Sequence, residues 1–151
     1  MNKKSFLKTL IIDYSIPIIL STYLLKKFIY LCEIKGNSML PNLIPGTRHI
    51  GMKLNIYNNI NRFDIVVINI DNKQIVKRII GLENEIVEYK DNKLFINGEY
   101  IKEDFLNNIE TNDLYIKLND NEYYCLGDNR NSSRDSRYYG PIKKDMIIAK
   151  L

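Results

Sequence analysis

The chain has 151 residues, of which 45% are hydrophobic and 26% charged, and its formal net charge is +4. This length fits one domain with a short appendage, and the composition excludes intrinsic disorder. Two cysteines exclude a disulfide framework and a four-cysteine zinc site. The positive excess lies within residues 1–35, whereas residues 36–151 carry no net charge. A basic folded domain is therefore absent, so we expect no nucleic-acid partner and favour a membrane surface.

The N-terminal segment predicts a helix that serves as a membrane anchor. Residues 9–25 are largely apolar, with Asp13 as the only charged residue, and lie between Lys8 and Lys26. As a helix they would be about 26 Å long, just short of a hydrocarbon core of about 30 Å. A buried core helix is the alternative, and a cleaved signal peptide is disfavoured because the only alanine is Ala149. Lysines on both sides leave the orientation open. We expect residues 1–31 to form the anchor and residues 32–151 the folded domain.

The rest of the chain predicts a β-rich domain, because short apolar or alternating runs are separated by turn residues. Asn97-Gly98 predicts a hairpin with a type I′ turn, and residues 119–121 predict a second hairpin. Residues 102–113 are polar and predict a loop. The expected strands are residues 48–53, 63–70, 74–80, 85–89, 93–96, 99–101, 114–118 and 122–126.

Four segments interrupt this strand pattern with polar or charged residues that could take part in catalysis. Ser38, in residues 36–41, is either an exposed hydroxyl on a tight loop or an ordinary turn residue. Lys77 interrupts an apolar strand, so it either faces water at a sheet edge or is desolvated. Burial would lower the lysine pKa and supply the neutral amine that a general base needs. Residues 126–140 are dense in charge and predict a hydrogen-bonded network or a polar surface loop, and residues 62–68 enter a strand through an Arg and an Asp.

Taken in order, these segments resemble the bacterial type I signal peptidases, which are membrane-anchored proteases that use a serine and a lysine. The resemblance runs from the N-terminal anchor to about residue 142. Its motifs are Ser-Met-x-Pro, an Asp-Ile-Val strand, Lys-Arg-x-x-Gly and Gly-Asp-Asn-x-x-x-Ser-x-Asp-Ser-Arg. The Asn97-Gly98 hairpin falls where the family also has Asn-Gly.

The resemblance implies a role for each matching residue. Ser38 would be the nucleophile, Lys77 the general base, and Ser133 the hydroxyl that orients the lysine amine. Gly36 stands where some members have a serine that helps the oxyanion hole, so backbone N–H groups would do more of that work here. The positions that brace the site through ion pairs are Asp128, Arg78, Asp135 and Arg137. Those that line the pocket for the small residue before the cut are Ile34, Met39 and Val76.

Departures from the family pattern spare both Ser38 and Lys77. Phe63 replaces the usual Gly before Asp64, and Asn42 replaces the usual Thr after the Pro.

Other catalytic mechanisms are disfavoured because the chain lacks the residues that they need. A Ser-His-Asp triad would have to use His49, the only histidine, and the cysteines and histidine lack metal-ligand spacing. Related self-cleaving repressors would need a DNA-binding domain before the serine, where only the anchor precedes it.

The resemblance implies a mainly β protein, with a catalytic domain of coiled antiparallel sheets and an N-terminal transmembrane helix. It implies a serine endopeptidase that removes signal peptides from exported preproteins, cutting after Ala-x-Ala-like sites and needing no cofactor. Membrane lipid would be its other partner. The expected location is the cell membrane, single-pass, with the catalytic domain on the extracytoplasmic face. The alternatives are an accessory protein of the same fold and a dedicated peptidase, serving the assembly of surface polymers such as pili.

Overall fold

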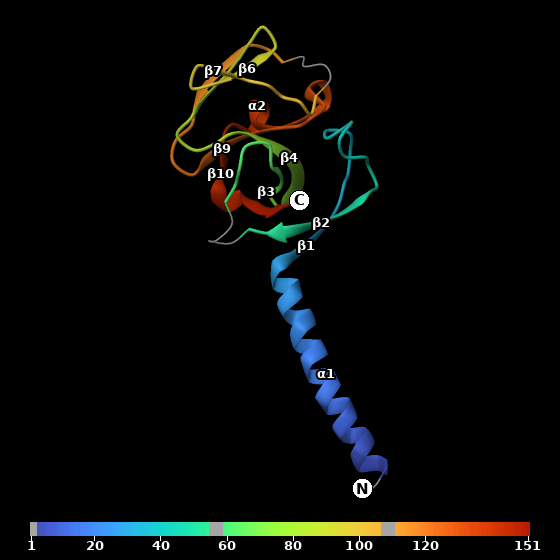
Figure 1. Ribbon diagram of the computed structural model, residues 1–151. Coiled ribbons are helices and arrows are strands. Elements are labelled where there is room, and N and C mark those ends of the chain that lie inside the picture. The colour runs from blue at the N-terminus through green and yellow to red at the C-terminus, as the bar shows by residue number, and fades with distance from the viewer. Residues whose placement is uncertain (1–2, 55–58, 107–110) are drawn as a thin grey trace.

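The computed structural model describes residues 3–54, 59–106 and 111–151. A long helix at the N-terminus projects away from a body built of strands, as Figure 1 shows. The helices are α1 (Lys3–Phe28) and α2 (Ser136–Tyr139), with 3-10 turns at Arg130–Ser132 and Lys144–Met146. The strands are β1 (Ile29–Glu33), β2 (Arg48–Lys53), β3 (Ile65–Ile70), β4 (Lys73–Gly81), β5 (Ile86–Lys90), β6 (Lys93–Ile96), β7 (Glu99–Ile101), β8 (Leu114–Lys117), β9 (Glu122–Leu126), β10 (Ile142–Lys143) and β11 (Ile147–Lys150).

The strands form two antiparallel sheets, which confirms the mainly β prediction. One sheet has the order β1-β2-β11-β3-β4-β9-β10, and the other has the order β7-β6-β5-β8. The Asn97-Gly98 hairpin is confirmed, because both residues have positive φ (52° and 86°), as a type I′ turn requires. Strand 48–53 is confirmed with the predicted bounds, and β3 starts at Ile65 rather than at residue 63.

The predicted hairpin across residues 119–121 is wrong. Strand β8 pairs with β5 in the smaller sheet, whereas β9 pairs with β4 and β10 in the larger one. Residues 119–121 therefore carry the chain between the two sheets. The predicted loop 102–113 includes residues 107–110, which lie outside the described part of the chain.

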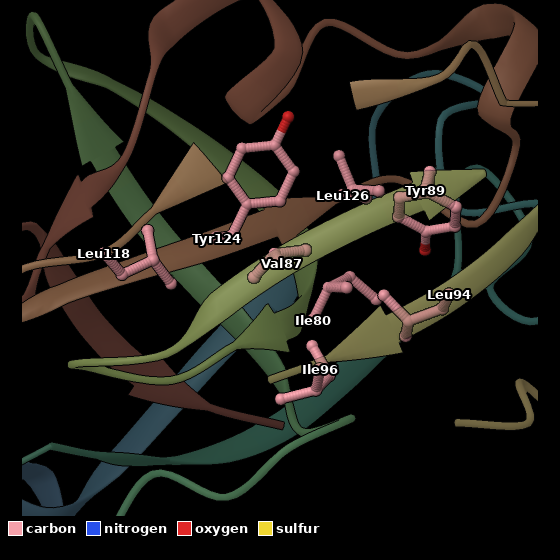
Figure 2. Close-up of a cluster of buried hydrophobic side chains, with 8 residues drawn as sticks. All are labelled: Ile80, Val87, Tyr89, Leu94, Ile96, Leu118, Tyr124 and Leu126. Atoms are coloured by element: carbon pink, nitrogen blue, oxygen red, sulfur yellow. The ribbon is translucent and has the colours of Figure 1, made fainter. Parts of the chain in front are cut away.

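Alternating side chains of β4 and β9 build two cores on opposite faces of the larger sheet. On one face, Ile80, Tyr124 and Leu126 pack against strands of the smaller sheet (Figure 2). On the other face, Ile79 and Cys125 pack with residues of β3, β10 and β11. Because both faces of β4 are covered, the lysine at its centre is enclosed by protein. This enclosure is what positions the site described below.

Helix α1 carries Pro17 and ends with Lys26 and Lys27 in its last turn, followed directly by β1. Residues 29–31, assigned to the anchor from sequence, therefore belong to a strand that pairs with β2. Among the described residues, no helix combines the length and hydropathy needed to cross a membrane. The apolar side chains that α1 exposes include Ile16, Ile18, Ile19, Leu20, Tyr23, Leu25 and Phe28.

Candidate active site

Ser38 lies in a turn that follows β1 and is fixed from two sides. Gly36 enters this turn with φ +78°, a left-handed conformation that a glycine adopts without strain. The side chain of Met39 is only 1% exposed and anchors the turn to the protein interior. From the other side, the backbone N–H of Asn129 donates to the Ser38 carbonyl at 3.0 Å. The backbone that carries the hydroxyl is thus held between a buried side chain and a neighbouring loop.

Lys77 is buried, with only 3% of the residue exposed, and its amine lies against Ser38. The amine nitrogen is 2.8 Å from Ser38 Oγ and 2.8 Å from the Val76 carbonyl oxygen. Burial lowers the pKa of the Lys77 amine from 10.5 to about 8, even though the carboxylates of Asp135 and Asp128 act in the opposite direction. The alternative of a water-facing edge lysine is therefore wrong. A substantial neutral fraction near pH 8 allows this amine to accept the serine proton.

Two ion pairs hold the segments that surround this pair. The Arg78 guanidinium donates to both oxygens of Asp128, at 2.8 and 2.6 Å, and ties β4 to the loop beside Ser38. Arg137 donates to both oxygens of Asp135, at 2.9 and 2.8 Å. Burial alone would raise the pKa of Asp135, but bonds from Arg137 and the Gly127 N–H lower it overall. All four residues predicted as braces are thus paired as bidentate ion pairs, the strong form of this interaction.

The structure does not place Ser133 in a hydrogen bond with Lys77. The buried Ser133 Oγ meets the geometry of a hydrogen bond with no described residue, although it is close enough to Asp135 to help lower the pKa of that carboxyl. The lysine amine uses the Val76 carbonyl of its own strand instead. Ser133 packs against Gly127, where an added Cβ would lie 2.2 Å from Ser133 Oγ and 2.6 Å from the Ser38 carbonyl oxygen. Gly127 therefore permits the close approach of the two serine-bearing segments.

A cleft of about 420 Å³ opens between β1 and β4, with Ser38 and Lys77 in its lining. Of the three residues predicted to form the substrate pocket, Val76 lines this cleft. The other two, Ile34 and Met39, do not line the cleft; they are buried in a cluster against which the lining residues Val76 and Cys32 pack. The full lining comprises Tyr30, Leu31, Cys32, Glu33, Lys35, Ser38, Val67, Asn72, Gln74, Ile75, Val76 and Lys77.

Two further residues support the site and were not predicted from the sequence. Asn42, noted there only as a departure, donates from its side chain to Asp128 Oδ2 at 2.8 Å and to the Phe105 carbonyl at 3.0 Å. Glu103, within the predicted polar loop 102–113, is 3% exposed and forms an ion pair with the buried Arg130. Asn42 was signalled by its position after the motif proline, whereas no local pattern distinguishes Glu103 from its exposed neighbours. His49 bonds to Thr47, not to Ser38.

Comparison with known proteins gives a consistent result. The family model described as "Signal peptidase, peptidase S26" matches residues 4–151. Signal peptidase I V of Bacillus subtilis is 34% identical, over 77% of this chain and 79% of that protein. A signal peptidase I of Bacillus amyloliquefaciens is also 34% identical, over 93% of this chain and 79% of that protein.

Among solved structures, the crystal structure of a signal peptidase I from Enterococcus faecalis is 33% identical. It matches with a TM-score of 0.59, covering 62% of this chain and 97% of that chain. The family match over nearly the whole chain and these relatives show that the chain belongs to the signal peptidase family, peptidase S26, and is a peptidase that removes signal peptides.

Proposed function

We propose that the chain cleaves preproteins with a dyad in which Ser38 is the nucleophile and Lys77 the general base. The observation that carries this proposal is the 2.8 Å separation of Lys77 Nζ and Ser38 Oγ, together with the burial of the lysine. A serine hydroxyl is a weak nucleophile until an adjacent base takes its proton. The apolar surroundings of Lys77 keep a fraction of its amine neutral for that purpose.

In the proposed cycle, Ser38 Oγ attacks the scissile carbonyl while its proton passes to the neutral Lys77 amine. The resulting ammonium gives that proton to the leaving amine as the peptide bond breaks, which produces an acyl-enzyme. Lys77 then takes a proton from water, and the hydroxide formed attacks the ester. When the ester bond breaks, the Ser38 oxygen takes that proton from Lys77, which restores both residues and releases the new carboxylate. Backbone N–H groups of the turn after Gly36, including that of Ser38, would stabilise the oxyanion.

The cleft between β1 and β4 supports binding of the substrate as an extended strand. Such a peptide would place alternate side chains into the enzyme. Ile34 and Met39 are buried and Val76 packs against them, so a substrate side chain that points at Val76 would meet a filled interior. We therefore propose small residues at the first and third positions before the cut, as in Ala-x-Ala. A bulky residue at the first position would overpack this site.

We further propose that the chain is a single-pass membrane protein with its catalytic domain on the extracytoplasmic face. Beside α1, cross-strand neighbours Leu31 and Ile50 are 75% and 71% exposed, and the pair Ile29 and Met52 is exposed next to them. Such adjacent apolar side chains fit contact with lipid. The division into anchor and peptidase domain is kept, but β1 begins at Ile29, so we place the junction after Phe28.

The dyad is tested by incubating the full chain in detergent with a preprotein and with a panel of its cleavage-site variants. Ser38→Ala and Lys77→Ala should each abolish cleavage, and the double variant should be little worse because the two residues act as a unit. Lys73→Ala is the matched control, since Lys73 lies exposed on the same strand. Substantial cleavage by Ser38→Ala would contradict the assignment.

Membrane attachment is tested by washing membranes that carry the full chain with high salt and with alkaline carbonate. Retention in the membrane pellet is expected, and a chain that begins at Ile29 should no longer be retained stably. Release of the full chain by salt alone would show a peripheral, electrostatic attachment instead.

A further inference from the structure

The active-site cleft continues beyond the dyad to a hydrogen bond that joins its two walls. The hydroxyl of Tyr30, on β1, donates to Oε1 of Gln74, on β4, at 2.6 Å. Both residues line the cleft that contains Ser38 and Lys77. Strands β1 and β4 are not neighbours in the sheet, since three other strands lie between them in its order. The bond therefore spans the cleft itself.

Strand periodicity places this bond in one row with the apolar residues near the dyad. Along β1, Tyr30 and Cys32 are partly buried while their neighbours are exposed, and the alternation continues to the buried Ile34. Gln74 shares its face of β4 with Val76, which packs against Ile34. Successive residues on one face of a strand are two apart. The row thus starts at Ile34, which is buried beneath the cleft lining, and passes through Cys32 and Val76 to a polar floor at Tyr30 and Gln74.

The spacing along the strand relates this polar floor to the cut. Tyr30 lies four residues before Ile34, which corresponds to about 13 Å at roughly 3.3 Å per residue. A substrate strand with its first residue over Ile34 would have its fifth residue over Tyr30. Because the first, third and fifth residues share one face, the side chain of the fifth would point at the Tyr30–Gln74 bond.

We propose that Tyr30 and Gln74 form a polar subsite for the fifth residue before the cut, which favours a hydrogen-bonding side chain over an aliphatic one. This inference rests on the proposed function and extends its substrate class. Within the described residues, the bond to Tyr30 is the hydrogen bond made by the Gln74 side chain. The Gln74 amide N–H groups and the lone pairs of the Tyr30 oxygen remain available to an amide or hydroxyl. An aliphatic residue would cover these groups without pairing them.

The test compares two peptides that carry Ala at the first and third positions and differ only at the fifth, which is Asn in one and Leu in the other. These side chains have similar shape. Full-length protein in detergent should cleave the Asn peptide with a kcat/KM about 2- to 13-fold higher, the range for one net hydrogen bond. Tyr30→Phe and Gln74→Met should each weaken this preference, because each removes one of its two hydrogen-bonding side chains. Tyr115→Phe, an exposed tyrosine on β8, is the matched control and should retain it.

A third peptide, with Phe at the first position, separates this subsite from the dyad and from a structural role. Discrimination against it should be the same in the wild type and in Tyr30→Phe. Equal cleavage of the Asn and Leu peptides by the wild type, or a preference for Leu, would overturn the subsite and leave the dyad standing. If Tyr30→Phe lowers kcat/KM equally for all three peptides, the Tyr30–Gln74 bond is a purely structural brace and the subsite is overturned. Cleavage of no peptide by the wild type would overturn the proposed function and the subsite together.

Discussion

The pKa of Lys77 makes the proposed base testable by pH alone. Burial lowers this pKa to about 8. The neutral amine is then about a tenth of the population at pH 7, half at pH 8 and nine tenths at pH 9. At the ordinary lysine pKa of 10.5, only about 0.3% would be neutral at pH 8, so burial raises the competent fraction more than about 100-fold. Cleavage by the full chain should therefore rise along an acidic limb centred near pH 8.

The assay measures kcat/KM for a short peptide between pH 5 and pH 10, because this parameter reports the ionisation of the free enzyme. Below pH 7 the rate should fall about tenfold per pH unit. If kcat/KM reaches half of its plateau below about pH 6, the base is not a lysine. If it does so only above pH 10, Lys77 is not desolvated.

Asp135 supplies an independent check on the origin of this limb. Among the neighbouring charges that raise the pKa of Lys77, the Asp135 carboxylate has the largest effect. Replacing it in Asp135→Asn removes that charge, so the lysine pKa should fall and the acidic limb should move to lower pH. Movement to higher pH would contradict the electrostatic account. Lys73→Ala, which changes an exposed charge on the same strand, should leave the limb in place.

Three further substitutions test the supporting structure. Lys77→Met should raise the free energy of unfolding at pH 7 by roughly 1–3 kcal/mol, because it removes a buried ammonium. This gain should shrink between pH 8 and pH 10.5, because the folded wild type has then lost the proton while the unfolded chain still holds it. Chemical denaturation at several pH values measures it. Gly127→Ala should nearly abolish cleavage, because the new Cβ would lie 2.6 Å from the Ser38 carbonyl oxygen; near-normal activity would contradict this. Glu103→Ala should lower the free energy of unfolding by about 3–5 kcal/mol, since Arg130 would remain buried without its carboxylate, and a loss below about 1 kcal/mol would show that the site is hydrated.

Local patterns predicted the strands well and their pairing less well. Asn97-Gly98 specifies its hairpin through the backbone angles of two adjacent residues, so sequence was sufficient there. The turn at residues 119–121 has similar chemistry, yet its two flanking strands join different sheets. Likewise β11, at the end of the chain, inserts between β2 and β3. Such long-range pairing depends on which apolar faces cover one another, and the turn residues do not encode it.

The same distinction applies to the site. Ser38 and Lys77 lie in recognisable motifs, but the sequence alone left open whether Lys77 faces water or is desolvated, and its burial in the structure decides this. Glu103 carried no signal, because a carboxylate in a polar segment is buried only through a partner far along the chain, here Arg130. The contact between Tyr30 and Gln74 joins residues 44 apart and follows from the placement of β1 relative to β4.

Phe63 shows how a departure from the family pattern is accommodated next to the dyad. It occupies the usual glycine position with φ 70°, a left-handed conformation that costs about 1–2 kcal/mol for a residue with a side chain. Its ring packs edge-on against Phe105, with centroids 5.0 Å apart, and its carbonyl accepts from Arg78 at 2.9 Å. The Arg78 guanidinium lies 4.1 Å from the Phe105 ring centroid while binding Asp128. Phe105 thus lies over the Arg78 guanidinium and Phe63 packs against Phe105, beside an ion pair whose two side chains are only 9% and 1% exposed. Shielding strengthens the attraction within an ion pair whose charges are already bonded.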